Sequence, residues 1–161
     1  MLNNIQKTYR EFPGSFWTLM AGTFIDRLGG AMMFPFFAIY ITEKFDVGMV
    51  VVGTVFAIFS SSSLLGSMVS GALTDNFGRK SMIIFGLVAS ALSSLIIPFI
   101  DRLNVFFVTS FFVGLFESVG GPARQAMIAD LLPEDKRAEG YAIHRVTFNL
   151  SAAIGPAIGG I

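Results

Sequence analysis

Long apolar segments alternate with short polar connections along the whole chain. A helix needs about 20 mostly apolar residues to cross a bilayer, and five segments are of about this length or longer. None of them shows the alternation of polar and apolar positions that is typical of barrel strands. The pattern therefore predicts an all-α membrane protein whose spans cover residues 16–42, 49–74, 82–100, 105–132 and 138–161.

The connections between these segments are only a few residues long, with the sequences EKFDVG, DNFGRKS, DRLN and PEDKR. Links of this length join antiparallel neighbours in a helix bundle, so we expect residues 1–161 to form one transmembrane bundle. The fifth segment runs to Ile161 without a following loop, which leaves its apolar face without a partner. The sequence therefore predicts an N-terminal bundle that is cut before a sixth span and a second half.

The composition supports the same class of protein. Hydrophobic residues make up 53% of the chain and charged residues 14%, whereas roughly 25% of the residues in an average soluble domain are charged. The mean hydropathy is +0.70. The net charge of zero argues against nucleic-acid binding, which requires a basic surface. Because the chain has no cysteine, it has no thiolate metal site. We expect no metal, no cofactor and no nucleic-acid partner.

The basic residues of the connections fall unequally on the two sides of the membrane. One side carries only Lys44 and Arg102. An excess of basic residues marks the cytoplasmic side of membrane proteins. We therefore expect a multi-pass protein of the cell membrane with a cytoplasmic N-terminus. The basic residues expected on the cytoplasmic side are Lys7, Arg10, Arg79, Lys80, Lys136 and Arg137.

The stretch GALTDNFGRK, residues 71–80, places several charges in a short connection. We expect Gly71 to allow the close approach of a neighbouring helix and Gly78 to take a positive φ in a tight connection. Asp75 can accept hydrogen bonds from amides at a helix start, and Arg79 offers a forked donor to a carboxylate. Taken alone, these residues suit a helix cap and a topology signal as well as a functional site.

Small residues recur in the segment before this connection, at 60–63, Gly66, Ser67 and Ser70. We expect them to allow close helix packing rather than to bind a substrate.

The spacing G-x-L-x-D-x-x-G-R-K between the second and third spans resembles the signature loop of the major facilitator superfamily. SAAIGPAIGG, residues 151–160, resembles the G-x-x-x-G-P-x-x-G-G motif of the drug/proton antiporters in that family, with Ser151 in place of the first glycine. PARQAMIADLLPEDKRAEG, residues 122–140, resembles the stretch that leaves the fourth span. The whole chain thus resembles the first five helices of a twelve-helix transporter.

The resemblance implies a conformational latch. In the family, the loop aspartate and arginine form a charge cluster with an aspartate at the cytoplasmic end of the fourth helix. This cluster holds the cytoplasmic side closed in the outward-open state. Carried over to this chain, the latch consists of Gly71, Asp75, Gly78, Arg79 and Asp130.

Two positions in the later spans bear on the antiporter resemblance. A proline inside a helix removes one backbone hydrogen bond, so we expect the fifth span to be kinked at its motif. Antiporters of this kind usually carry an arginine in the fourth span, at the position that Ser110 occupies here. The residues of the expected helix-kink motif are Gly155, Pro156, Gly159 and Gly160.

Three ionisable residues lie deep in the predicted spans, where charge is costly. Asp26 and Arg27 belong to the first span and Glu117 to the fourth, and the two carboxylates fall near the expected midplane. One interpretation is a neutral structural network that the three residues form together. The others are proton coupling and substrate contact, for which all three are candidates.

The leading hypothesis is a secondary active transporter of small organic molecules that works by alternating access, with proton-coupled efflux. Its expected partners are a small-molecule substrate, protons and the lipid bilayer. The alternatives are an intramembrane enzyme and a transport-inactive membrane fragment. We expect no enzyme, because the sequence has no phosphate-binding loop, no H-E-x-x-H motif and no nucleophile–base pair, and its one histidine is His144.

Overall fold

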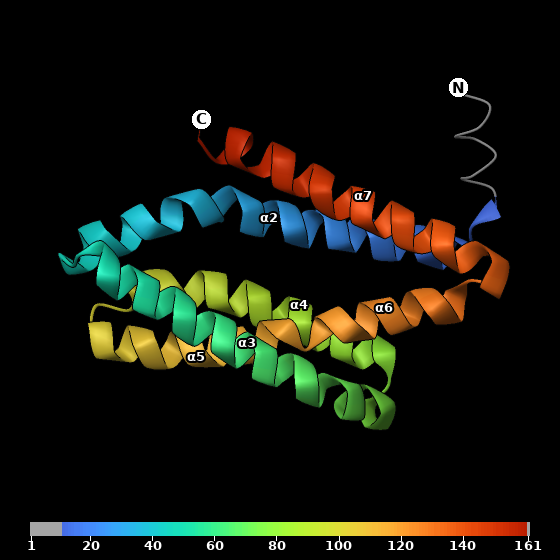
Figure 1. The fold of residues 1–161 in the computed structure, drawn as a ribbon, viewed down its shortest axis with the longest axis horizontal. Coiled ribbons are helices and arrows are strands. Elements are labelled where there is room, and N and C mark those ends of the chain that lie inside the picture. The colour runs from blue at the N-terminus through green and yellow to red at the C-terminus, as the bar shows by residue number, and fades with distance from the viewer. Residues whose placement is uncertain (1–10, 161) are drawn as a thin grey trace. The chain divides into compact units, whose positions relative to one another are not determined.

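The computed structural model describes residues 11–160, and every regular element in this range is helical. The all-α prediction is confirmed, whereas the expectations for Lys7, Arg10 and Ile161 lie outside the described residues. A short 3₁₀ helix, η1 (Ile97–Phe99), follows α4. The α-helices, shown in Figure 1, are α2 (Gly14–Phe45), α3 (Met49–Phe77), α4 (Arg79–Ile96), α5 (Leu103–Ser118), α6 (Gly120–Leu131) and α7 (Glu134–Gly159).

Four helical segments within residues 11–160 are long and apolar enough to cross a membrane. They are Gly14–Phe45, Met49–Phe77, Arg79–Phe99 and Leu103–Leu131. Helix α7 covers most of the predicted fifth span but is not among these four, because its charged and polar residues keep its mean hydropathy low. The fifth span therefore stays a prediction.

Two connections are shorter than the sequence analysis expected. Only Gly78 separates α3 from α4, so Asp75 belongs to the last turn of one helix and Arg79 to the first turn of the next. Similarly, only Leu132 and Pro133 separate α6 from α7, and the charged residues after Pro133 form the first turn of α7.

Residues 33–124 form one compact unit, in which α3 packs along α5 and α4 packs against both (Figure 1). The backbones of α3 and α5 touch. A side-chain carbon on Gly66 would clash with the carbonyl oxygen of Leu115, and one on Gly114 would clash with the α3 backbone. The buried hydroxyl of Ser70 donates to the carbonyl oxygen of Val119 at 2.6 Å. Because lipid tails give no hydrophobic drive for association, close packing and interhelical hydrogen bonds hold such helices together.

Ser62, Gly66 and Ser70 are spaced four residues apart and are all buried. Residues at this spacing lie on one face of a helix, and this face is the one that contacts α5. The expectation that small residues serve helix packing is therefore confirmed for these three residues, whereas Ser60 and Ser61 are exposed. Helix α4 also packs closely at a glycine. A side-chain carbon on Gly86 would lie 3.0 Å from the Cα atom of Gly120.

At one end of this unit, Lys44 joins two connections. Its Nζ lies 3.3 Å from Asp101 Oδ1 and also donates to the carbonyl oxygen of Pro98. The connections that carry Lys44 and Arg102 therefore lie at the same end of the unit, as the alternation of helices predicts. The apolar cluster of this unit consists of Ile41, Val52, Val55, Ile100 and Phe106.

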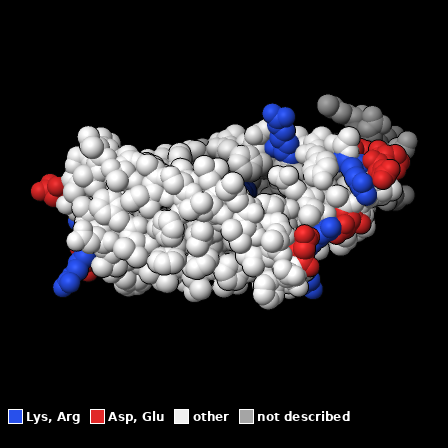
Figure 2. Space-filling model, turned by 60° about the horizontal axis from the view of Figure 1, so that its bottom comes forward, with Lys and Arg blue, Asp and Glu red and all other residues white. Residues whose placement is uncertain are grey.

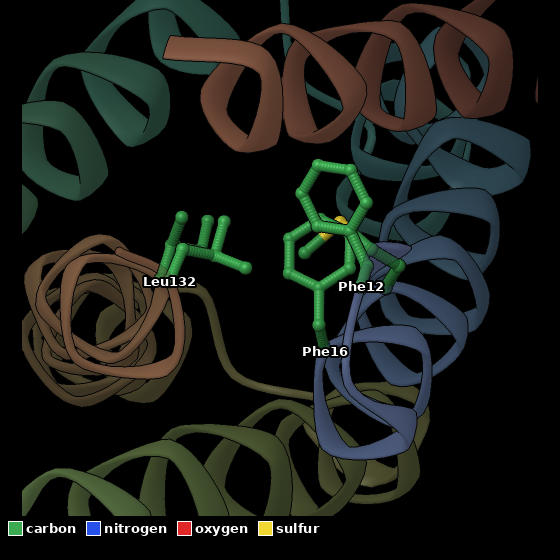
Figure 3. Close-up of a cluster of buried hydrophobic side chains, with 5 residues drawn as sticks. Phe12, Phe16 and Leu132 are labelled. Atoms are coloured by element: carbon green, nitrogen blue, oxygen red, sulfur yellow. The ribbon is translucent and has the colours of Figure 1, made fainter. Parts of the chain in front are cut away.

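Residues 11–32 and 125–160 belong to the second unit, in which the first half of α2 contacts α7 (Figure 1). A side-chain carbon on Gly155 would lie 2.5 Å from Ala31 Cβ, and one on Gly159 would lie 2.5 Å from the carbonyl oxygen of Met32. Figure 3 shows the apolar cluster of this unit, where Phe12 and Phe16 point toward Leu132.

The face of the molecule that Figure 2 draws carries little charge. On the face drawn in Figure 2, uncharged residues cover most of the surface. Several large apolar side chains are almost fully exposed, including Val50 at 85%, Phe99 at 82% and Met68 at 80%. Many other large apolar side chains are exposed as well. Large apolar patches are rare on soluble monomers, so this surface suits contact with lipid.

The contact between α3 and α5 gives a direct test. We expect Gly66→Ala to lower the free energy of unfolding by roughly 1–3 kcal/mol, because the new carbon would force the Leu115 backbone outward. Gly53→Ala, on the same helix but with no atom within 4 Å of the added carbon, is the matched control and should be neutral or slightly stabilising. The measurement is thermal unfolding of the purified protein in detergent. Equal stability of the two variants would contradict the packing described here.

Candidate functional site

Glu117 lies near the middle of the segment Leu103–Leu131, where the helix is interrupted. Val119 forms a turn between α5 and α6. Pro122 explains this interruption, because it has no N–H to donate to the carbonyl of Ser118 and its ring crowds that carbonyl. The half-buried Glu117 thus lies two residues before Val119, which is not in a regular helix.

The interruption also positions a backbone acceptor. The carbonyl oxygen of Val119 accepts the hydrogen bond from Ser70, so the backbone at the break contributes to the contact with α3. Discontinuous spanning helices are a common way to bring backbone polar groups into the middle of a membrane. The sequence predicts one uninterrupted span over residues 105–132, and this break is not part of that prediction. The triplet Gly120–Gly121–Pro122 was the signal that could have revealed it.

Asp26 and Arg27 lie in the first half of α2, which belongs to the other unit. Asp26 is half-buried and Arg27 is exposed. The guanidinium carbon of Arg27 lies 5.3 Å from the centroid of the Phe148 ring on α7, which is the geometry of a cation–π contact. This aromatic partner of Arg27 was not predicted from the sequence.

Ser110, which replaces the antiporter arginine, uses its hydroxyl locally. It is buried on α5, and its Oγ donates to the carbonyl oxygen of Phe106 at 2.8 Å. Ser110 provides no positive charge there, and this hydrogen bond lies within its own helix.

The connection between α3 and α4 agrees with one expectation and corrects two. Gly78 has a φ of 82°, so the predicted positive φ is confirmed. Asp75 does not cap α4, because Gly78 occupies the N-cap position and no side chain bonds there. A side-chain carbon on Gly71 would meet no described atom within 4 Å, so the close approach expected at Gly71 is not made within residues 11–160.

The stretch between α6 and α7 is held by its basic residues. Arg137 Nε donates to the carbonyl oxygens of Ala129 at 3.1 Å and Leu132 at 3.3 Å, which satisfies acceptors at the end of α6. Lys136 Nζ lies 2.6 Å from Glu11 Oε2. The hydrogen bond to the Glu11 carboxylate holds the pKa of Lys136 above its usual value.

The residues of the predicted latch are divided between the two units. Asp75, Gly78 and Arg79 belong to the unit of residues 33–124, whereas the exposed Asp130 lies on α6 in the other unit. Asp26 and Glu117 are divided in the same way. The latch and the pairing of these carboxylates therefore remain predictions.

The motif in α7 has a packing role that the kink interpretation did not include. Ser151 is fully buried, and its Oγ donates to the carbonyl oxygen of Phe24 on α2 at 3.2 Å. With Gly155 and Gly159, it forms a row of small residues against α2. The helix continues through Pro156 to Gly159, and the expected kink stays a prediction.

These features define a multi-pass helical membrane protein whose helices are joined through small residues. The family model of the major facilitator superfamily matches residues 19–161. The chain belongs to the major facilitator superfamily, as its three sequence motifs indicated.

Relatives within this superfamily carry different names. The chain is 33% identical over 157 residues to a Na(+), Li(+), K(+)/H(+) antiporter of Planococcus maritimus, covering 94% of this chain and 37% of that protein. It is 30% identical over 158 residues to multidrug resistance protein 2 of Bacillus subtilis, covering 97% of this chain and 39% of that protein. It is also 30% identical over 153 residues to the uncharacterized MFS-type transporter YqjV of Bacillus subtilis, covering 95% and 37%. The chain thus spans less than two fifths of the length of these relatives.

Proposed function

We propose that the protein containing this chain is a secondary active transporter that exports small organic molecules in exchange for protons by alternating access. The observation that carries this proposal is the half-buried Glu117 beside the break between α5 and α6. Transporters bind substrates and coupling ions near the midplane, often at discontinuous helices. A carboxyl group at that depth raises the free energy of the folded protein in the membrane. Its presence there therefore indicates a functional role.

Asp26 and Arg27 extend the proposed site. Asp26 is the second carboxylate within an apolar segment, and we assign it with Glu117 to proton coupling or substrate contact. Arg27 supplies the positive charge that Ser110 does not. The family membership and the name of the multidrug resistance relative support an exporter of organic molecules.

A second candidate is the exchange of monovalent cations for protons. It is favoured by the name of the Planococcus maritimus relative, which includes sodium, lithium, potassium and protons. Carboxylates suit this function as well, because hard cations prefer oxygen ligands. The two candidates differ in the solute that moves against the proton.

Substitution of the two carboxylates tests both candidates. We expect Asp26→Asn and Glu117→Gln in the full-length protein each to abolish proton-driven transport, because the neutral amides cannot bind and release a proton. The measurement is transport by reconstituted vesicles under an imposed pH gradient, with sodium, potassium and lipophilic organic cations offered separately. The solute that moves decides between the candidates.

Asp46→Asn is the control for these two variants. Asp46 lies in the connection between α2 and α3 with a φ of 51°, a conformation that asparagine tolerates well. This variant should transport like the wild type. If Asp26→Asn and Glu117→Gln also keep wild-type rates across a pH series, neither carboxylate takes part in coupling.

We also assign Gly71, Asp75, Gly78, Arg79 and Asp130 to a latch on the cytoplasmic side. Charge clusters of this kind can form and break as helix groups rock between two states. We expect Asp75→Asn to slow transport at least about fivefold, the low end of usual coupling free energies, without lowering the yield of folded protein. Asp135→Asn, an exposed carboxylate in the first turn of α7, is the comparison. Unchanged transport by Asp75→Asn would rule out the latch.

The latch requires that the connection between α3 and α4 face the cytoplasm, with the N-terminus on the same side and the protein in the cell membrane. Single cysteines test this, because the chain has none of its own. In intact cells, a membrane-impermeant thiol reagent should label Arg102→Cys and leave Lys80→Cys unlabelled. Both positions are exposed, so permeabilised cells should label both. The reverse pattern in intact cells would invert the topology.

A further inference from the structure

An apolar groove of about 520 Å³ lies between α3, α4 and α5. Leu73 and Phe77 contribute from α3, Phe85 from α4 and Phe116 from α5. Of the described residues that line it, Ser81 alone has a polar side chain. All of these residues belong to the unit of residues 33–124. The volume lies within the usual range for small-molecule sites.

The groove follows α3 from Gly66 to Phe77. At a rise of 1.5 Å per residue this length is about 16 Å, which is close to half of the roughly 30 Å hydrocarbon core of a bilayer. Phe77 is the last residue of α3. The groove therefore begins where the helix ends and extends over the depth of about one leaflet.

The width of the groove limits what can fill it. A volume of 520 Å³ over about 16 Å makes the groove longer than it is wide. A helix with its side chains is about 10–12 Å in diameter, so it could lie over the groove but not within it. A single hydrocarbon chain fits, because its carbons keep only about 4 Å from their neighbours.

The end of the groove carries groups that attract an anion. Phe77 and Ser81, which line it, lie on either side of the sequence Gly78–Lys80. Lys80 is exposed, and the first turn of α4 has no side-chain cap, so its free amides point out of the helix start. With Asp75, Arg79 and Lys80, this end has one net positive charge.

From these observations we infer a lipid-binding site: the groove holds one acyl chain of an anionic phospholipid, whose phosphate binds at Lys80 and the first turn of α4. The apolar lining takes the chain, the depth matches one leaflet and the charge at the end selects the head group. This inference is independent of the transported solute.

Native mass spectrometry of the purified full-length protein tests the site, with phosphatidylglycerol and phosphatidylcholine of identical chains as probes. We expect the wild type to retain phosphatidylglycerol about fivefold better than phosphatidylcholine. This factor corresponds to the roughly 1 kcal/mol of one basic side chain near an anionic surface. Lys80→Glu should remove this preference, whereas Arg102→Glu, an exposed cation of another connection, should keep it.

The acyl chain is tested by filling the groove. Val69→Trp, which places a large ring among the lining residues, should lower the retention of both lipids. Val88→Trp is the matched control. Val88, on α4, is exposed to a similar extent as Val69 but does not line the groove. Thermal unfolding of each variant verifies that it is folded.

Three outcomes would overturn the inference. One is wild-type lipid retention by both Lys80→Glu and Val69→Trp. Another is displacement of phosphatidylglycerol by inorganic phosphate alone, which would mean that the groove does not hold the chain. The third is a combination of two results: the wild type retains no lipid, and Val69→Trp fails to fold. Together they would indicate that another part of the protein, rather than a lipid, fills the groove.

Discussion

The backbone contact between α3 and α5 is the interaction on which the unit of residues 33–124 depends. Helices surrounded by lipid gain nothing from hiding apolar side chains from water, so they associate through close contact and hydrogen bonds. Gly66 and Gly114 allow the backbones to touch, and Ser70 then reaches the carbonyl of Val119. The depth and direction of α5, and with them the position of Glu117, follow from this contact.

The same solution appears a second time in α7. Ser151, Gly155 and Gly159 make contact with α2 at a spacing of four residues, the spacing that Ser62, Gly66 and Ser70 have on α3. Serine can take the place of the first glycine of the family motif because its hydroxyl bonds to the carbonyl oxygens of Phe24 and Thr147. A small polar residue is tolerated in such a contact when its hydroxyl donates a hydrogen bond to backbone carbonyl oxygens. A larger side chain would separate the helices.

Much of the fold could be predicted from the sequence, because long apolar segments leave a chain in lipid no regular structure other than a helix or a closed barrel. The positive φ of Gly78 was also predictable, since glycine takes that conformation without a steric cost.

The cap role of Asp75 was predicted wrongly, because the length of the turn could not be read from composition. One residue was enough to connect the two helices, so Asp75 belongs to α3. The interruption at Val119 was not predicted because residues 105–132 are long and apolar enough for one span, although Pro122 breaks the hydrogen-bond pattern. For the candidate site, the sequence gives the residues but not their pairing, which depends on contacts between distant helices.

The turn at Gly78 also bears on why its charged neighbours are present. A negative side chain is unfavourable in the last turn of a helix, and a positive side chain is unfavourable in the first turn, because each has the same sign as the adjacent end of the helix dipole. Asp75 and Arg79 occupy these two positions. Their identities therefore do not stabilise the helices that contain them. Residues that break a local rule in this way are expected at functional sites, which supports a role for both in interactions beyond their own helices. The contact between α3 and α5 is made by small residues, and Asp75 and Arg79 are not among them.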